Sequence, residues 1–245
     1  MTDYDPTAYG AKIAEDYDRL YEGLLDTDRT VACLADLAAG GPVLELGIGT
    51  GRLAIPLVER GLRVDGVESS PAMVDQLRAN PGGAGIDVVI GDFADVTVPG
   101  PFRLVVLALN TIFALPSQDA QVACFANAAS HLEEGGRFVI EAWVPDPGRF
   151  VGGSAVTVRR LRADHVSLDL AQVDPTTQRM TTTQVSLRDG EVRLYPANHR
   201  YAWPSEFDLM ARLAGLRLEQ RWGGWDRRPF TDVSSAHVSV YRRTD

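Results

Sequence analysis

The residues best suited to chemistry gather first in one short stretch, VLELGIGTG, which covers residues 43–51. An apolar segment that carries a single acid, Glu45, is followed by glycine at every second position, Gly47, Gly49 and Gly51. A buried strand that runs into a glycine-rich turn brings the backbone close to a ligand, because glycine has no side chain to keep the ligand away. This stretch therefore predicts a ligand-binding turn.

Two further acids follow apolar segments downstream. Glu68 ends the run LRVDGVE at 62–68, and Asp92 ends IDVVIGD at 86–92. Carboxylates at three strand ends would repel a pyrophosphate. The charge pattern therefore argues against a ligand that is held by its phosphates.

Two common nucleotide-binding motifs do not fit the spacing. A P-loop requires a lysine directly after its last glycine, but Arg52 follows Gly51, and Lys12 is the only lysine in the chain. A dinucleotide site requires Gly-x-Gly-x-x-Gly/Ala, and here the third glycine comes one residue early. Both motifs are excluded by the residues present.

The stretch ELGIGTG and the acids after it resemble the class I S-adenosylmethionine-dependent methyltransferases. Their first motif is an acidic strand end followed by Gly-x-Gly-x-Gly, and their second marker is an acid at the end of the second strand, where Glu68 stands. The resemblance implies that Glu68 accepts hydrogen bonds from the ribose hydroxyls. It also implies that Asp92 accepts from the adenine amine and that Phe93 packs near the adenine ring.

The resemblance implies S-adenosylmethionine as the cofactor, held at the carboxyl ends of successive strands. Asn110 closes the fourth of these strands, and Tyr17-Asp18-x-x-Tyr21 is similar to an N-terminal helix that closes over the cofactor. The complete set of residues expected at the cofactor is Tyr21, Glu45, Gly47, Gly49, Gly51, Glu68, Ser69, Met73, Asp92, Phe93, Leu109 and Asn110.

The methyl acceptor is expected to be a small molecule, methylated on nitrogen or oxygen. IEAW at 140–143 and the sheet inserted before HRYAWPSEFDLM at 199–210 are similar to those of sugar-amine N,N-dimethyltransferases of antibiotic pathways, to which glycine-type N-methyltransferases are related. Five aromatic residues are candidates for the substrate site: Tyr17, Phe113, Trp143, Tyr201 and Trp203. For Trp143 and Trp203, packing in the core or in an interface is the preferred interpretation.

His199 is the candidate general base. A hydroxyl acceptor needs a base within hydrogen-bond reach, whereas a neutral amine needs little help. The alternative reading, a strand histidine at the surface, stays open. The four histidines lie on separate segments without the spacing of metal ligands, so no metal site is expected.

The periodicity of apolar residues predicts an α/β protein with a Rossmann-like, doubly wound, mostly parallel seven-stranded sheet. Strands are expected at 43–46, 62–68, 86–92, 102–110, 137–143, 217–222 and 236–243. Helices are expected over 8–39, with Thr30 as a cap, over 52–60, from Ser70-Pro71, over 117–134, closed by Gly135-Gly136, and over 204–216, capped by Ser205.

An antiparallel sheet is expected as an insertion before the last helix. Four β-rich runs at 154–161, 165–173, 179–187 and 191–203 are separated by turn residues. The chain then divides into a helical lid (1–40), a cofactor-binding core (41–150), the inserted sheet (151–203), and a closing helix and strand pair (204–245). The inserted sheet is expected either to cover the substrate or to form the contact of a homodimer.

Composition limits the possible partners and surroundings. The chain has 245 residues, of which 45% are hydrophobic, and a formal net charge of −9, so no basic surface is expected to hold a nucleic acid. The first residues lack the basic and apolar regions of a signal peptide, and no apolar run is long enough to span a bilayer. A cytoplasmic protein without a membrane partner is therefore expected.

Two alternatives to a methyltransferase remain at this point. One is a protein that binds S-adenosylmethionine or S-adenosylhomocysteine without catalysis. The other is a nicotinamide-dependent oxidoreductase, because unrelated activities share this fold.

Overall fold

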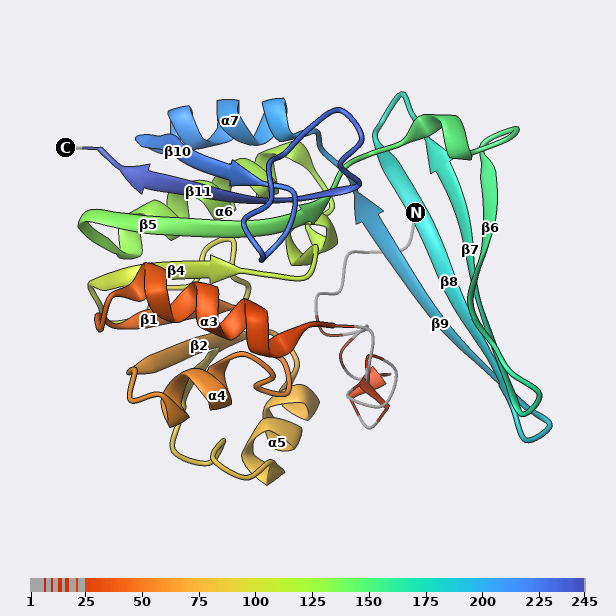
Figure 1. The fold of residues 1–245 in the computed structure, drawn as a ribbon, viewed down its shortest axis with the longest axis horizontal. Coiled ribbons are helices and arrows are strands. Elements are labelled where there is room, and N and C mark those ends of the chain that lie inside the picture. The colour runs from red at the N-terminus through yellow and green to blue at the C-terminus, as the bar shows by residue number, and fades with distance from the viewer. Residues whose placement is uncertain are drawn as a thin grey trace.

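The computed structural model describes residues 7, 10, 13, 14, 16, 17, 21 and 25–244, apart from the side chain of Pro147. It contains a seven-stranded sheet with the strand order β10-β11-β5-β4-β1-β2-β3 (Figure 1). The strands are β1 (Val43–Leu46), β2 (Val64–Glu68), β3 (Asp87–Ile90), β4 (Phe102–Leu107), β5 (Leu132–Trp143), β10 (Leu216–Trp222) and β11 (Ala236–Arg243). The predicted fold class is confirmed.

Strand direction explains how the sheet is built. The pairs β1–β2, β2–β3, β1–β4 and β4–β5 are parallel, while β11 runs antiparallel to both β5 and β10. Parallel neighbours require crossovers, and α4 (Ala54–Glu59), α5 (Pro71–Ala79) and α6 (Gln118–His131) supply those from β1 to β2, from β2 to β3 and from β4 to β5. The other helices are α3 (Thr27–Ala38) before β1 and α7 (Pro204–Leu213) before β10, and there are short 3-10 turns, η1 (Thr111–Ala114) and η2 (Pro147–Arg149).

The apolar core forms two layers, one on each face of the sheet. Along β4, Val105 and Leu107 join the layer beneath α6 and α7, whereas Leu104 and Val106 join the layer beneath α3 and α4. Successive strand residues point to opposite faces, so a strand buried on both sides is apolar throughout. This is why the central strands lack an alternating polar pattern.

Several predicted boundaries are wrong, each for a local reason. Helix α3 begins after Asp26, whose side chain accepts the Arg29 N–H, so Thr30 lies inside the helix. Helix α6 ends at His131 because Leu132 is already extended, and β5 runs through the glycine pair expected to close that helix. Trp203, rather than Ser205, is the N-cap of α7. Most of the helix expected before residue 25 lies outside the described residues.

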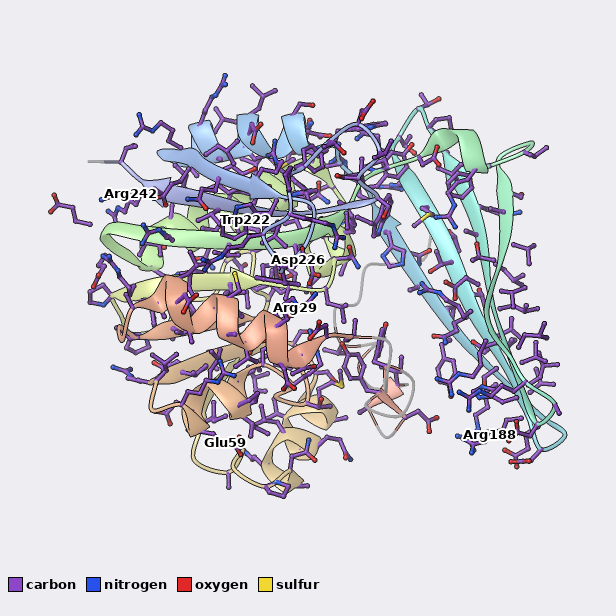
Figure 2. The ribbon with its side chains drawn as sticks, in the orientation of Figure 1. Arg29, Glu59, Arg188, Trp222, Asp226 and Arg242 are labelled. Carbon is purple, nitrogen blue, oxygen red and sulfur yellow. The ribbon has the colours of Figure 1, made fainter. Side chains whose placement is uncertain are left out.

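The segment between β5 and α7 forms a separate four-stranded sheet, called the inserted sheet below. It comprises β6 (Ser154–Leu161), β7 (His165–Asp174), β8 (Arg179–Arg188) and β9 (Glu191–Arg200), paired antiparallel in chain order. The fourth run therefore ends at Arg200, three residues earlier than expected. Figure 2 shows Arg188 at the tip of this sheet, far from the seven-stranded sheet.

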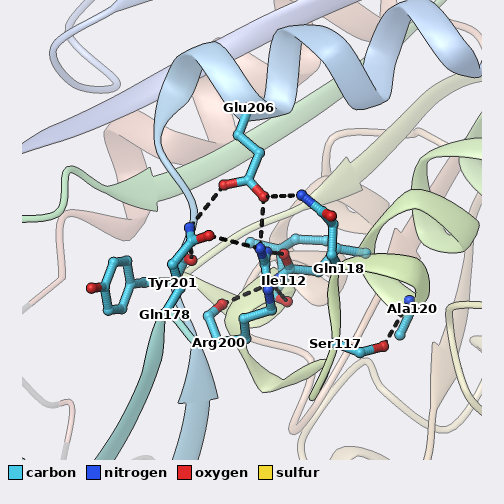
Figure 3. Close-up of polar contacts among 9 residues, drawn as sticks. Ile112, Ser117, Gln118, Ala120, Gln178, Arg200, Tyr201 and Glu206 are labelled. Atoms are coloured by element: carbon cyan, nitrogen blue, oxygen red, sulfur yellow. Dashed lines mark hydrogen bonds and ion pairs between the residues drawn. The ribbon is translucent and has the colours of Figure 1, made fainter. Parts of the chain in front are cut away.

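A buried polar network joins the inserted sheet to the core (Figure 3). Arg200, at the end of β9, donates to Gln121 Oε1 at 2.5 Å, to Gln178 Oε1 at 3.0 Å and to Glu206 Oε1 at 2.7 Å. Gln121 in turn donates to the carbonyl oxygens of Ile112 and Arg200. Helices α6 and α7, the turn η1 and the inserted sheet therefore meet around one guanidinium group.

No helix in the part of the chain that the structure describes is both long enough and apolar enough to cross a bilayer.

We expect Arg200→Ala to lower the free energy of unfolding by about 3–5 kcal/mol, because removing one partner leaves the buried charge of Glu206 without its counter-charge. The side chains of Arg200 and Glu206 are only 7% and 16% exposed. Urea unfolding of the purified variant measures this change. Arg29→Ala is the matched control, since Arg29 and Asp26 form an exposed pair, and pairs of this kind contribute about 0–1 kcal/mol. Equal effects of the two substitutions would contradict a stabilising role for the network.

Candidate functional site

The glycine-rich turn after β1 is shaped by backbone conformations that glycine adopts freely. Gly47 and Gly49 have φ angles of +70° and +56°, in the left-handed region that most residues avoid. A Cβ atom at Gly47 would lie 2.8 Å from Thr111 Cγ2, which is too close for any side chain. Residues 47–51 therefore pass close to the end of β4, and a larger residue at position 47 would push the two apart.

Glu68 fixes this turn to the end of β2. Its Oε2 accepts the Gly49 N–H at 3.0 Å, and its Oε1 accepts the Ser70 N–H at 3.0 Å. Ser69 Oγ lies 3.5 Å from Oε1. Each oxygen of an ionised carboxylate can accept more than one hydrogen bond, so Glu68 keeps acceptor capacity for ligand hydroxyls. The structure thus brings together the ends of β1 and β2, as the motif predicted.

Glu45 is a buried acid with one unused oxygen. No donor from the described residues reaches its Oε2. Burial raises the pKa of Glu45 to about 8, although the nearby Arg52 guanidinium lowers it; the Glu68 carboxylate raises it further. A buried polar atom without a partner is costly, so this oxygen is suited to a ligand that brings a donor or a positive charge.

The remaining residues expected at the cofactor lie at the neighbouring strand ends and on α5. Asp92 follows β3 and accepts the Ala94 N–H, and Met73 lies on α5, its Cε 3.6 Å from a Cβ built at Gly49. Phe93 is only 8% exposed and packs in the core layer beneath α6. Its ring is therefore part of the core as well as a neighbour of Asp92.

Tyr17 and Tyr21 lie beside the glycine-rich turn. Their ring centroids are 4.8 Å apart. Together with Thr50, Gly51 and Arg52 they line a pocket of about 360 Å³. The structure therefore brings both tyrosines to the turn that follows β1. Tyr17 packs against a cluster that includes Met73 and Tyr195, whereas the other aromatic residues expected at the substrate pack in or against the core layer beneath α6 and α7.

Those other aromatic residues form one cluster between the end of β4 and the inserted sheet. Phe113 and Trp143 are 4.6 Å apart, Trp143 and Tyr201 6.1 Å, and Tyr201 and Trp203 5.3 Å between ring centroids. Phe113 and Tyr201 are almost fully buried, whereas Trp143 and Trp203 are half-buried. The two tryptophans are thus the accessible members of this aromatic cluster.

His199 lies on the inner face of the inserted sheet, which is the face toward the core. Its Nε2 is 3.0 Å from Thr182 Oγ1, and its register partner Met180 packs against the core. Burial lowers the pKa of His199 to about 4, so the imidazole is neutral at pH 7. The histidine is therefore not the exposed strand residue of the alternative reading.

Leu109 and Asn110 follow β4 in left-handed conformations, with φ angles of +52° and +63°. The Leu109 N–H donates to Glu141 Oε2 at 2.8 Å, and Asn110 Oδ1 accepts the Trp143 N–H at 2.6 Å. Sequence reasoning included Leu109 and Asn110 but missed Glu141. An acid near the end of the fifth strand, in IEAW, was the available signal, since β5 lies beside β4.

Metal binding has no visible basis in residues 25–244 and the described residues before them. No group of three or more histidine, cysteine, aspartate or glutamate side chains lies close enough together there to hold an ion.

Comparison with known proteins agrees with this arrangement. Residues 43–136 match a family model described as a methyltransferase domain. The CcbJ methyltransferase of Streptomyces caelestis shares 39% of its residues with this chain and superposes with a TM-score of 0.88, over 99% of this chain and 100% of that one.

Two further relatives extend the comparison. The cypemycin N-terminal methyltransferase of a Streptomyces species is 29% identical over 98% of this chain and 99% of its own length. CalS10 from Micromonospora echinaspora, an amino pentose methyltransferase, shares the fold at 22% identity, with a TM-score of 0.72 over 93% of this chain and 96% of that one.

These matches to methyltransferases leave no support for the nicotinamide-dependent alternative. The order of the glycines and acids after β1, β2 and β3 is also that of the methyltransferase motif. The chain belongs to the class I S-adenosylmethionine-dependent methyltransferases and is an enzyme with S-adenosylmethionine as its cofactor.

Proposed function

We propose that this enzyme methylates an amine nitrogen of a small molecule, at the aromatic cluster formed by Phe113, Trp143, Tyr201 and Trp203. One observation carries the choice of nitrogen over oxygen. Burial keeps both His199 and Tyr201 neutral at pH 7: it lowers the pKa of His199 to about 4 and raises the pKa of Tyr201. Neither group is matched to removing a hydroxyl proton at pH 7, since an effective base titrates near the working pH.

The proposed cofactor contacts come from the acids at the strand ends. S-adenosylmethionine supplies an electrophilic methyl group on a positively charged sulfur. Glu45 Oε2, which lacks a partner among the described residues, faces the cationic part of the cofactor. Glu68 accepts from the ribose hydroxyls, and Asp92 accepts from the adenine amine. The residues present therefore fit this cofactor.

The remaining proposed contacts come from Tyr21 and Ser69 and from the two residues after β4, Leu109 and Asn110. A neutral amine held in line with the methyl group needs orientation more than proton transfer, because alignment of donor and acceptor supplies much of the acceleration. The half-buried tryptophans, Trp143 and Trp203, orient the acceptor in this proposal. The relatives described as N-terminal and amino pentose methyltransferases support an amine acceptor.

We propose that the inner face of the inserted sheet covers the acceptor site. We also propose that its outer face forms the contact between two copies of the chain. The outer face carries Val156, Val158, Leu161, Leu170, Leu187, Val192 and Leu194, which are between 39% and 77% exposed. Register places them on one face, since Val158, Leu168, Val185 and Leu194 pair across all four strands. Exposed apolar patches of this extent mark contact surfaces.

A cytoplasmic location, the absence of a nucleic-acid partner and the division of the chain at residues 40, 150 and 203 stay predictions from the sequence.

The choice of an amine is tested by turnover against pH with three acceptors: an amino sugar, a peptide with a free N-terminal amine, and a phenol. We expect methylation of an amine, with kcat/KM rising through the pKa of that amine. His199→Ala should stay within about threefold of wild type, because removal of an actual general base costs about 10²–10⁴-fold. His165→Ala is the matched control, since His165 also pairs with a strand hydroxyl, Ser186. Exclusive turnover of the phenol, with a large loss in His199→Ala alone, would overturn the proposal.

The role of Glu45 is tested by calorimetric titration with S-adenosylhomocysteine between pH 6 and pH 9. The pKa of Glu45 is about 8 in the free protein, and a bound ammonium group favours the ionised acid. Below pH 8, binding therefore releases the proton of the Glu45 carboxyl group. The affinity should rise by up to about tenfold per pH unit in this range and level off above pH 8. Glu45→Gln should bind more weakly and lose this slope. An unchanged slope in Glu45→Gln would assign the dependence to another group.

The dimer is tested by sedimentation of the 26.6-kDa chain. We expect the wild type to sediment as a dimer and Val158→Asp/Leu194→Asp as a folded monomer, because charges on the buried face of an interface are costly. Leu213→Asp is the control, since Leu213 is also an exposed apolar residue but lies on α7. A monomeric wild type would contradict the proposed interface.

A further inference from the structure

The end of β4 adopts a conformation that the local sequence does not favour. Leu109 and Asn110 are two successive residues with left-handed φ angles, +52° and +63°. Left-handed backbone is unfavourable for residues with a Cβ atom, although asparagine tolerates it better than leucine does. At Leu109 it persists only where the surrounding structure enforces it. This pair of residues is called the β4-end turn below.

Hydrogen bonds from β5 enforce this turn. Glu141 Oε2 accepts the Leu109 N–H at 2.8 Å, and the Glu141 carbonyl oxygen accepts the Asn110 N–H at 3.1 Å. Asn110 Oδ1 returns the contact by accepting the Trp143 N–H at 2.6 Å. Both residues of the turn are therefore hydrogen-bonded to β5. The Glu141 side chain makes the bond to Leu109.

The turn lies directly against the glycine-rich motif. Thr111 follows it, and its Cγ2 atom occupies the space that a Cβ of Gly47 would need, at 2.8 Å. Thr111 also bonds back to the Ala108 carbonyl oxygen at 2.7 Å. A shift of the β4-end turn would therefore move Thr111 relative to Gly47, and with it one wall of the cofactor site.

A second group fixes the Glu141 carboxylate itself. Trp225 Nε1–H donates to Glu141 Oε1 at 2.8 Å. Trp225 belongs to the loop between β10 and β11, which Figure 1 shows in front of the sheet on the side of α3, and Figure 2 labels Trp222 and Asp226 in the same region. The loop is anchored on α3, because Arg227 donates to Asp36 at 3.2 Å and its guanidinium lies over the Trp222 ring.

We propose that Glu141 is a positioning residue for the cofactor, which locks the β4-end turn against Gly47 while Trp225 holds its carboxylate in place. The loop between β10 and β11 is thereby part of the binding machinery, although it lies far along the chain from residues 43–51. This inference rests on the proposed placement of the cofactor beside Leu109 and Asn110.

The test exploits the fact that an amide cannot replace this carboxylate. Both Glu141 oxygens accept hydrogen bonds, whereas the amide of Glu141→Gln has one acceptor and one donor group. The amide NH₂ must then face either the Leu109 N–H or the Trp225 Nε1–H. Trp225→Phe removes the second of these donors, so the double variant Glu141→Gln/Trp225→Phe lets the amide oxygen accept from Leu109 without conflict.

Binding of S-adenosylhomocysteine is measured by calorimetry for the wild type, both single variants and the double variant. We expect Glu141→Gln to bind about tenfold more weakly, consistent with the loss of one charged hydrogen bond. Trp225→Phe should bind about threefold more weakly than the wild type, because the carboxylate is no longer held in place. The double variant should recover to a similar level, because it avoids two opposed donors. A simple loss of stability would not produce such a recovery.

Glu219→Gln is the matched control, since Glu219 is a carboxylate paired with Arg137 in the middle of β5, away from the β4-end turn. It should bind as the wild type does. Affinity of Glu141→Gln within twofold of the wild type, or a double variant no better than Glu141→Gln, would overturn the proposal. Wild-type protein that binds but transfers no methyl group to an amine would instead count against the proposed acceptor and leave this inference standing.

A second measurement tests the proposal without Glu141→Gln, in case that variant does not fold. Amide hydrogen exchange of the segment around Leu109 is compared between the wild type and Trp225→Phe. We expect faster exchange in Trp225→Phe, by about threefold or more, because the acceptor of the Leu109 N–H is no longer held. S-adenosylhomocysteine should slow this exchange in both proteins. Identical exchange with and without Trp225 would show that the loop does not hold the turn.

Discussion

Parallel pairing of β1 with β2 on one side and with β4 on the other brings every part of the site to one edge of the sheet. Glu45 is in register with Gly66 of β2 and with Val106 of β4. The residues after Leu46, after Val67 and after Leu107 therefore emerge side by side. The hydrogen bond from Gly49 to Glu68 and the contact between Gly47 and Thr111 are both consequences of this register, and a slip in either pairing would separate them.

The strand ends that form the candidate cofactor site could be predicted from sequence because the residues that mark them are local, whereas the contacts of these residues with the cofactor stay predictions. ELGIGTG, Glu68 and Asp92 each sit at the end of a short apolar run, and strand ends in a parallel sheet meet at one edge. The Glu141–Leu109 contact could not be predicted in this way, since its partners are 32 residues apart. The same holds for Arg200 and Gln121, which are 79 residues apart. These contacts depend on the packing of whole elements rather than on a spacing.

Local sequence patterns predict the wrong helix boundary where two residues could each start or end the helix. Thr30 and Ser205 are good capping residues by type, yet Asp26 and Trp203 precede the first turns of their helices. Gly135-Gly136 has the form of a helix stop, but Leu132 leaves the helical conformation first and pairs with Phe102 of β4. His199 was placed on the correct strand, and only its surroundings reveal that burial lowers its pKa to about 4.

The two sheets differ in the sequence separation between their paired strands. In the inserted sheet each strand pairs with the next in chain order, so every pairing closes a short turn. In the seven-stranded sheet, β4 pairs with β1 and β11 with β5, across long intervening segments. Folding rates fall as contacts become less local. The inserted sheet thus has the connectivity of an early-forming unit, whereas the ends of β1 and β4 meet only when the long segment between them has closed.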